Sequence, residues 1–545
     1  MKPAAGVPAI EDLAGHLAAA ATAEPTRPAT ILPRGRFRRS GFRTTTYGEL
    51  DRRVDVIAAG LTAAGIGPGV RTALLVPPTE DFFALAFALL RAQAVPVLID
   101  PGIGRAFVRT CLAEVAPAAF IGVPRAHLAR RVLRWCPSAS LLVTVGPPVP
   151  AGGRSLAAVE RVGRALLPFR PPPVDPDATA AIAFTSGSTG VPKGVEYRQP
   201  HFLAQLRMIR ELYDIVDGEV SLATFPPFAL LGPALGLTTV VLRMDASRPA
   251  RVNPERLADA ANTFGATLMF GSPALLDTVS RWGERTGARL PTLRRVISAG
   301  APVRPAVQRR LLGLLSGDAE VHTPYGATEA LPVTSIGSRE LLTLPEGGIC
   351  VGRPVPGVDV ALVRISDEPL RSVTDDLLVP AGEVGEVVVR GPNVTTSYAE
   401  RPAATAAAKL DWDGRVAHRM GDLAYADRAG RLWFCGRKIH RVTTAAGTMF
   451  PVPCEEVFNA HPDVLRSALV GVGPRAGQRP VICVELERSA RASAALTRAL
   501  LDLAVADPVT ARIDTVLYHP AFPVDVRHNA KIDREALAAW AARRL

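Results

Sequence analysis

Stretches with helical hydrophobic periodicity alternate with short apolar runs through much of the chain. Residues 46–66 have the pattern of an amphipathic helix, and the apolar run 71–78 follows as a buried strand. A second helical stretch over 81–94 leads into another apolar run at 95–100. Strands separated by helices of about ten to fifteen residues are typical of βαβ units, so we predict a parallel sheet. The same alternation returns over 255–300.

The C-terminal third of the chain has a different pattern. Helical stretches give way to short β-runs, first over 382–391 and then over 424–438. Within the second run, residues 427–430 have the composition of a hairpin turn. We therefore predict an α/β fold with two parts. These are a large N-terminal multi-sheet α/β domain, residues 1–436, and a small mobile α+β C-terminal domain, residues 437–545.

Composition and charge narrow the function classes. Hydrophobic residues make up 48% of the 545 residues and charged residues 21%, which excludes a disordered chain. The net charge is +12, but the basic residues are scattered without interleaved aromatic side chains, so we expect no nucleic-acid partner. Only five of the 63 basic residues are lysines. Because arginine serves as the general cation, a lysine in a glycine-rich loop or near the chain end is more informative than usual.

Cysteine usage and apolar stretches bear on the cellular compartment. The six cysteines form no Cys-x-x-Cys pair and have no histidine at zinc spacing, so we expect small buried side chains in a reducing compartment. Glu11 and Asp12 stand where a signal peptide needs its apolar core, so we expect no export signal. Residues 220–242 carry no charge, but three prolines and two glycines interrupt them, which favours a buried strand, loop and helix over a membrane span. We expect a soluble cytoplasmic protein without an integral membrane segment.

The most informative segment is a loop rich in glycine, serine and threonine. It follows an apolar strand expected over 181–184, and Lys193 and Gly194 close it. Its six central residues are Thr185, Ser186, Gly187, Ser188, Thr189 and Gly190. Glycines let backbone N–H groups turn inward, hydroxyls add donors and the lysine adds a cation, which is the chemistry of polyphosphate binding. A flexible linker would not directly follow four apolar residues, and the chain has no Gly-Lys-Ser/Thr sequence of a P-loop.

Together with five further motifs in the same order, this loop resembles the signature of the adenylate-forming superfamily. That superfamily comprises acyl-CoA synthetases, firefly luciferase-like enzymes and peptide-synthetase adenylation domains. The further motifs are Ser298–Pro302, Tyr325–Glu329, Met420–Leu423, Gly436-Arg437 and Asn529–Ile532. The resemblance covers nearly the whole chain from about residue 45. It implies ATP as the nucleotide and Mg²⁺ as its metal.

The resemblance assigns a nucleotide-binding site. Besides the loop and Lys193, its residues are Gly300, Ala301, Pro302, Tyr325, Gly326, Thr328, Asp422 and Arg437. The ring of Tyr325 would stack on the adenine, although a lone aromatic residue is usually part of a core. Thr328 would bond the α-phosphate. Asp422 would accept both ribose hydroxyls, and Arg437 would reach the ribose or the phosphate.

The catalytic residues implied by the resemblance are Lys193, Thr328, Glu329 and Lys531. Glu329 would bind Mg²⁺, a hard cation suited to carboxylate and phosphate oxygens. Lys531 would bridge the substrate carboxylate and the α-phosphate, cancelling charge as the two anions meet. A lysine near a chain end is usually solvated, but this chain otherwise prefers arginine. The implied first step is attack of a carboxylate on the α-phosphate of ATP, giving an acyl-adenylate and pyrophosphate.

The apolar segment 224–232 indicates the kind of acid. It contains no charged residue, so it offers no partner to an ammonium group or a second carboxylate. We assign Phe225, Phe228, Leu231 and Gly232 to the substrate pocket and expect an apolar, long-chain acid. The alternative, that these residues belong only to the core, stays open.

Departures from the superfamily pattern indicate a narrower group. Acyl-CoA synthetases commonly carry an acid two residues after the hinge arginine, where this chain has Ile439, and Ala530 replaces a glycine in the C-terminal motif. Residues 322–333, 436–442 and 523–532 most resemble the β-lactone synthetases of bacterial olefin and lipid β-lactone pathways. The resemblance implies a second step, in which the 3-hydroxyl of an adenylated long-chain 2-alkyl-3-hydroxy acid attacks the acyl carbon, closing a β-lactone and releasing AMP.

No second substrate needs to enter for that step, which suits the missing hinge acid. His322, His440 and His528 are candidates for the base that deprotonates the hydroxyl. The chain ends fourteen residues after Lys531, so we expect a stand-alone enzyme. Its expected partners are a small-molecule acyl substrate and other enzymes of the same lipid pathway. Two alternatives stay open: a fatty acyl-CoA or acyl-AMP ligase acting on a long-chain fatty acid, and a degenerate nucleotide-binding protein, which the complete set of site residues disfavours.

Overall fold

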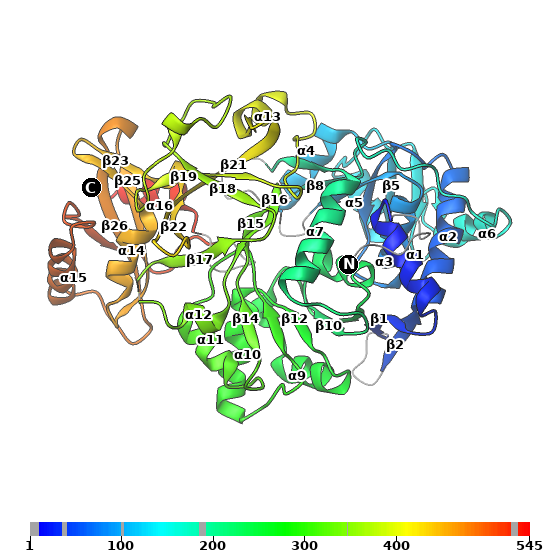
Figure 1. Ribbon diagram of the computed structural model, residues 1–545, viewed down its shortest axis with the longest axis horizontal. Helices are drawn as coiled ribbons and strands as arrows, with labels where there is room; N and C mark the ends of the chain where they lie inside the picture. Colours follow the sequence, from blue (N-terminus) through cyan, green and yellow to red (C-terminus); the bar gives the residue numbers. More distant parts are fainter. Residues whose placement is uncertain (1–9, 35–40, 100–102, 185–191, 346, 525–531) are drawn as a thin grey trace.

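The fold is seen in a computed structural model that describes six ranges of the chain. These are residues 10–34, 41–99, 103–184, 192–345, 347–524 and 532–545. The strands of the described residues form two seven-stranded sheets, one eight-stranded sheet and two small sheets. Figure 1 shows the small sheets and the last helices gathered at one end of the long axis.

The first seven-stranded sheet has the order β7-β6-β5-β3-β4-β8-β9 and is parallel except at β9, which runs antiparallel to β8. Its strands are β3 (Arg71–Leu75), β4 (Val95–Ile99), β5 (Ala119–Gly122), β6 (Leu141–Thr144), β7 (Arg154–Ser155), β8 (Ala181–Phe184) and β9 (Gly194–Tyr197). The helices within this part are α2 (Tyr47–Ala63), α3 (Glu80–Arg91), α4 (Arg105–Val115), α5 (Pro124–Val132) and α6 (Leu156–Arg164). The predicted βαβ alternation is confirmed here.

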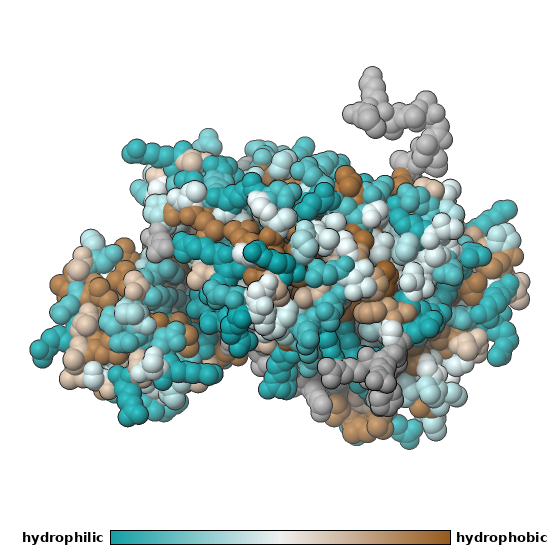
Figure 2. Space-filling view, turned by 90° about the horizontal axis from the view of Figure 1, so that it is seen from below, coloured by the Kyte–Doolittle hydropathy of each residue, from teal (hydrophilic) through white to brown (hydrophobic). Residues whose placement is uncertain are grey.

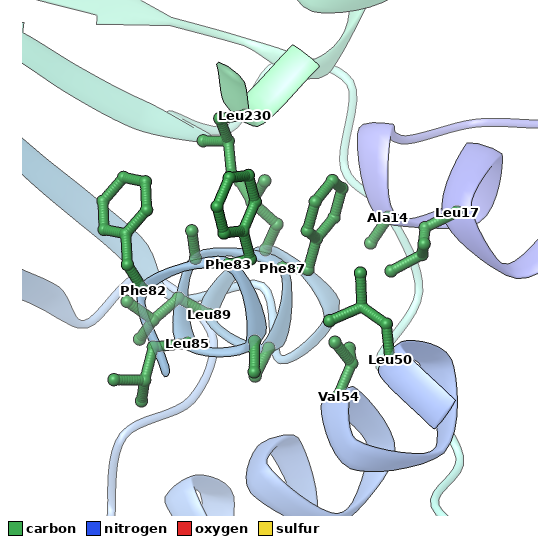
Figure 3. Close-up of a cluster of buried hydrophobic side chains, with 14 of the residues drawn as sticks. Ala14, Leu17, Leu50, Val54, Phe82, Phe83, Leu85, Phe87, Leu89 and Leu230 are labelled. Atoms are coloured by element: carbon green, nitrogen blue, oxygen red, sulfur yellow. The ribbon is translucent and has the colours of Figure 1, made fainter. Parts of the chain in front are cut away.

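Helix α3 is the centre of the N-terminal core. It is apolar on every side, and its residues from Phe82 to Arg91 are all buried, as expected for a helix surrounded by other elements. Figure 3 shows Phe83 and Phe87 directed toward Leu230 and toward α1 (Leu13–Ala23), with Leu50 of α2 beside them. The polar end of the helix is also fixed, because Arg91 pairs with two aspartates of α2.

The second seven-stranded sheet has the order β14-β13-β12-β10-β11-β1-β2 and is parallel except at β2. Its strands are β1 (Pro28–Pro33), β2 (Phe42–Thr46), β10 (Val220–Ala223), β11 (Thr238–Val241), β12 (Leu268–Phe270), β13 (Arg295–Ile297) and β14 (Glu320–His322). The helices of this part are α7 (Gln199–Leu212), α8 (Pro226–Ala234), α9 (Pro254–Thr263), α10 (Pro273–Thr286) and α11 (Pro305–Leu312). The carboxyl ends of β10, β12, β13 and β14 therefore lie along one edge.

The eight-stranded sheet is antiparallel and carries several of the motifs. Its order is β15-β16-β17-β22-β21-β19-β18, and β20 pairs with β21 outside this path. Its strands are β15 (Tyr325–Ala327), β16 (Ala330–Ser335), β17 (Ile349–Pro354), β18 (Asp359–Val363), β19 (Gly385–Arg390), β20 (Lys409–Trp412), β21 (Arg415–Ala426) and β22 (Leu432–Arg437). Two short helices, α12 (Ser338–Leu341) and α13 (Pro402–Ala408), accompany it. The hairpin predicted around 427–430 joins β21 to β22.

The C-terminal elements build their own small core. The hairpin β23 (Val442–Thr444) and β24 (Gly447–Met449) and the sheet β25 (Val464–Val472), β26 (Arg479–Leu486) and β27 (Val516–Tyr518) are accompanied by three helices. These are α14 (Pro451–Asn459), α15 (Ala494–Ala506) and α16 (Arg534–Ala542). In Figure 2 this part forms the lobe at the left, and polar side chains cover much of the visible face. The boundary at 436/437 and the mobility of this part stay predictions.

Two further expectations bear on the class of protein. The predicted mixed α/β fold is confirmed, and all six cysteines are free and buried, as expected. The uncharged stretch 220–242 forms a strand, a helix and a strand rather than a strand, loop and helix, because Pro226 and Pro227 stand in the first turn of α8, where proline is favourable. Over the described ranges, no helix is long and apolar enough to cross a membrane.

Candidate active site

A cleft of about 3050 Å³ opens among the three large sheets and the C-terminal elements. Sites for drug-sized ligands measure about 300–1,000 Å³, so this cleft has room for a nucleotide and an acyl chain together. Five of the sequence motifs contribute to its lining: Lys193, Ser298–Pro302, Tyr325–Glu329, Met420–Asp422 and Gly436-Arg437. The loop residues Thr185–Gly190 and the later Lys531 and His528 lie outside the described residues.

Asp422 is held between a tyrosine and an arginine. Its Oδ2 accepts a hydrogen bond from the hydroxyl of Tyr325 at 2.7 Å, and its Oδ1 lies 3.0 Å from Nε of Arg437. Asp422 and Arg437 are partners in the register of β21 and β22. Burial and the charge of Asp422 raise the pKa of Tyr325 well above its usual value, and the same charge raises the pKa of Arg437. The tyrosine therefore stays a donor and the arginine a cation at neutral pH.

Asp422→Asn is expected to weaken ATP binding about tenfold to a hundredfold. The change keeps the shape of the side chain but removes the charge facing Arg437, and hydrogen bonds to charged groups contribute about 1.5–3 kcal/mol each. Titration calorimetry with a non-hydrolysable ATP analogue measures the loss. Asp359→Asn is the matched control, because that exposed carboxylate pairs with Arg390 on the same sheet. Wild-type affinity in the Asp422 variant would contradict the assigned role.

The turn after β13 brings the backbone to the cleft. Ser298 is buried, its backbone N–H donates to the carbonyl oxygen of His322 at 2.9 Å, and Gly300 follows at φ +91°. That left-handed conformation favours glycine, since side chains rarely adopt it. The predicted adenine contacts Gly300, Ala301 and Pro302 all line the cleft here.

Glu329 lies between β15 and β16 and is anchored at both ends. Its carbonyl oxygen accepts from the N–H and the hydroxyl of Thr395 at 2.9 and 3.1 Å, and its Oε1 accepts from the hydroxyl of Tyr398 at 2.5 Å. Burial and the charge of Glu329 raise the pKa of Tyr398, so its hydroxyl keeps its proton and remains a donor. Nearby, the carbonyl oxygen of Thr328 accepts from the hydroxyl of Tyr197 at 2.5 Å.

This arrangement fits a magnesium ion that arrives with its nucleotide. Mg²⁺ is usually held by one or two carboxylates, with water and substrate phosphates completing its shell. Within the part of the chain that the structure describes, no group of three or more His, Cys, Asp or Glu could hold a metal. Among the described residues, Glu329 would therefore be the oxygen ligand, with phosphates and water also contributing to the shell.

Two lysines flank the ring of Tyr398. Nζ of Lys193 lies 4.8 Å and Nζ of Lys409 lies 6.0 Å from the ring centroid. Lys409 donates to the carbonyl oxygen of Thr395, and burial lowers its pKa to about 7 against the opposing effect of the Glu329 charge. Neither Tyr398 nor Lys409 belongs to a predicted motif. The scarcity of lysine in this chain is the only sequence signal that distinguishes Lys409.

The sequence matches the profile of a known family over residues 17–399, described as AMP-binding enzyme. The chain belongs to this family. Olefin beta-lactone synthetases of Stenotrophomonas maltophilia (strain K279a) and Xanthomonas campestris pv. campestris are 51% and 50% identical to it, over 92% of this chain and 92% and 91% of theirs. The structure of O-succinylbenzoate coenzyme A synthetase from Bacillus subtilis with ATP and magnesium is similar at a TM-score of 0.75 and 18% identity, covering 96% and 98% of the two chains, which shows the fold.

The family and the two relatives confirm the predicted superfamily and the narrower resemblance. The protein is an ATP-dependent adenylating ligase of the AMP-binding enzyme family. The expectation of a small-molecule acyl substrate fits this membership.

In this AMP-binding enzyme, the apolar segment 224–232 forms one wall of the cleft. Phe225, Phe228 and Leu231 line it, and the ring of Phe228 stacks on Phe270 of β12 with centroids 4.0 Å apart. Phe225 lies 5.8 and 6.0 Å from the same two rings. The aromatic wall offers dispersion contacts to an apolar chain and no charge.

Gly232 has a different place in this AMP-binding enzyme. A Cβ there would lie 2.0 Å from Oγ1 of Thr239, so the close packing of α8 on β11 requires glycine. Gly232 also borders a separate cavity of about 60 Å³ together with Phe228 and Leu231. That volume is far too small for a long acyl chain, so the large cleft is the better candidate for it.

The candidate bases occupy unequal positions in the AMP-binding enzyme. His322 in β14 packs its ring 5.0 Å from that of Tyr213 and is not among the described residues that line the cleft. His440 does line the cleft, and burial together with the charges of Arg534 and Arg437 lowers its pKa to about 3. It is therefore a neutral imidazole, able to accept a hydrogen bond.

The residues after Arg437 are tied to the antiparallel sheet of the AMP-binding enzyme by ion pairs. Glu386 of β19 lies 2.7 Å from Arg419 and 3.0 Å from Nζ of Lys438, and its side chain is only 1% exposed. Arg441 lies 2.6 Å from Asp367. Ile439, at the hinge position, thus stands between anchored cations in the short 3₁₀ helix Lys438–His440.

Proposed function

We propose that this enzyme adenylates a long-chain 2-alkyl-3-hydroxy carboxylic acid and closes it to a β-lactone, forming AMP and pyrophosphate. The observation that carries the proposal is the identity of about half of all positions with two olefin beta-lactone synthetases over nine-tenths of the chain. An uncharged aromatic wall supports an apolar substrate. Other enzymes of the same lipid pathway, which supply the hydroxy acid and consume the lactone, are its proposed partners.

In the first step, a carboxylate oxygen of the acid attacks the α-phosphorus of ATP and pyrophosphate leaves. Mg²⁺ at Glu329 would supply charge neutralisation on the phosphates. Asp422 would hold the ribose, Thr328 would bond the α-phosphate, and Lys193 would face the polyphosphate. Lys531 and the loop Thr185–Gly190 complete the proposed set from their motifs. Positioning and charge neutralisation account for most of such phosphoryl chemistry.

In the second step, the 3-hydroxyl oxygen attacks the acyl carbon of the same molecule. The bond from that carbon to the AMP oxygen breaks, AMP leaves as an anion, and the hydroxyl proton passes to a base. Ring strain opposes closure, while the activated anhydride and the held intramolecular geometry favour it. The anchored residues around Ile439 support a reaction that needs no large domain rotation to admit a second substrate.

A product assay tests the proposal. The enzyme is incubated with ATP, Mg²⁺ and a long-chain 2-alkyl-3-hydroxy acid, with and without CoA, and the products are identified by mass spectrometry and NMR. We expect a product lighter than the acid by one water, formed with AMP and indifferent to CoA, with NMR distinguishing the lactone from a dehydrated alkene. The matched acid without the 3-hydroxyl should stop at the acyl-adenylate. A thioester formed only with CoA would overturn lactone closure and favour the acyl-CoA ligase.

A further inference from the structure

His418 is a buried histidine in the wall of the cleft. It is 3% exposed, and it lines the cleft together with Lys193, Glu329 and Tyr398. Its ring is hydrogen-bonded to the backbone of Ala408, while Nδ1 has no hydrogen-bond partner among the residues that the structure describes. A buried polar atom without a partner is costly, and because His418 lines the cleft, a ligand bound there is the candidate that completes the bond.

The surroundings of His418 are cationic. In the register of β20 and β21 it stands directly opposite Lys409, so the two side chains share a face. The charged groups that act on its ring are Lys409, Lys193 and Arg437, from three different segments of the chain. Burial and these three charges hold the pKa of His418 well below its usual value. The imidazole is therefore neutral at neutral pH when the cleft holds no anion.

A polyphosphate entering the cleft reverses these electrostatics. Its negative charges offset those of Lys193 and Arg437 and favour the imidazolium form of His418. With one ring nitrogen already bonded to the backbone of Ala408, the added proton falls on Nδ1, the atom without a partner. A charged N–H donor to a phosphate oxygen is among the stronger hydrogen bonds of proteins.

We propose that His418 is a polyphosphate-binding residue, which takes a proton from solvent as the nucleotide binds and donates Nδ1–H to a phosphate oxygen. The proposal rests on the adenylating activity and is independent of whether a lactone or a thioester is made. On release of pyrophosphate the proton returns to solvent.

A second histidine shows why burial alone does not make such a site. His127 of α5 is also 3% exposed, its Nε2 lies 3.1 Å from the carbonyl oxygen of Val143, and its Nδ1 likewise lacks a partner among the described residues. It is not among those lining the cleft, and Arg130 is the one cation of the described part of the chain that acts on it. His127→Gln is therefore the matched control for His418→Gln, because each amide can keep the bond to the backbone while removing the titrating nitrogen.

The test measures how many protons the enzyme takes up when a nucleotide binds. A non-hydrolysable Mg²⁺–ATP analogue is titrated into the full chain near pH 7 by calorimetry, in two buffers of different ionisation enthalpy. We expect the wild type and His127→Gln to take up about one proton more than His418→Gln, which should also bind the analogue about tenfold more weakly. Lys409 titrates near the same pH and stands opposite His418, so the NMR measurement described next, which observes imidazoles directly, separates the contributions of the two residues. Equal proton uptake in His418→Gln and the wild type would overturn the proposal.

A second measurement, on the wild type alone, tests the proposal if His418→Gln does not fold. Histidine-selective ¹⁵N NMR of the wild type, titrated with inorganic pyrophosphate, should show one imidazole passing from neutral to cationic. Spectra in which no histidine changes protonation while pyrophosphate binds would also overturn the proposal. If neither nucleotide nor pyrophosphate binds the wild type at all, the adenylating activity itself fails, which is a different result.

Discussion

Glu329→Gln is expected to lower the rate of ATP–pyrophosphate exchange by about a hundredfold to a thousandfold. The amide keeps the size of the side chain and an oxygen for the hydroxyl of Tyr398, so the turn should stay intact. It removes the negative charge that would hold Mg²⁺. A metal ion contributes several kcal/mol of charge stabilisation to phosphoryl transfer, and each 1.4 kcal/mol is a factor of ten in rate. Radioactive pyrophosphate exchange measures the effect without assuming the acid's final product.

Glu160→Gln is the matched control for that experiment. Its carboxylate has 14% side-chain exposure, pairs with Arg53 and is not among the described residues lining the cleft. Its exchange rate should equal that of the wild type. The exchange rate of Tyr398→Phe should lie between the rates of Glu160→Gln and Glu329→Gln, because this change removes one hydrogen bond to Glu329 and keeps the charge. Full exchange in Glu329→Gln at low Mg²⁺ would contradict a metal-binding role.

Glu386→Gln is expected to reduce the free energy of unfolding by about 3–5 kcal/mol. Removing one partner of a buried ion pair leaves the other charge uncompensated, and here two cations depend on the same carboxylate. The side chains of Arg419 and Lys438 are 4% and 14% exposed. Water therefore solvates the two uncompensated cations only poorly. Urea denaturation followed by tryptophan fluorescence measures the change.

The control for this second experiment is an exposed carboxylate with two arginine partners. Glu340 pairs with Arg353 and Arg431, and its side chain is 38% exposed. Glu340→Gln should cost less than about 1 kcal/mol, since exposed pairs contribute little. Equal losses in the two variants would show that burial of the Glu386 pairs adds no stability.

Local patterns in the sequence predicted the fold class and a good part of the site. The alternation of helical and apolar stretches is a property of consecutive residues, so the parallel sheet around β3 and β4 followed from it. Tyr325, Asp422 and Arg437 stand in motifs, and the structure brings Tyr325 and Arg437 each within hydrogen-bond distance of Asp422. Their proposed roles toward the nucleotide stay predictions.

Residues without a motif could not be found in this way. Tyr398 lies in the loop after β19 and His418 in β21, and both line the cleft. Lys409 of β20 stands opposite His418 without lining the cleft, and this pairing joins residues that belong to no common motif. Phe270 completes the aromatic wall from a different strand than Phe228. Such contacts depend on tertiary packing, which the composition of a single segment does not specify.

The scarcity of lysine in this chain has a chemical consequence. An acyl-adenylate and a strained four-membered lactone are both acylating agents, and amines are their natural targets on a protein. Of the three lysines that the structure describes, Lys438 is paired with Glu386, and Lys409 is buried against Thr395 and is not part of the cleft lining. Lys193 is the one that lines the cleft. Arginine, which stays protonated, supplies nearly all other cations. Among its described residues, the proposed enzyme thus exposes few lysine amines to its own products, which limits acylation of lysine during turnover.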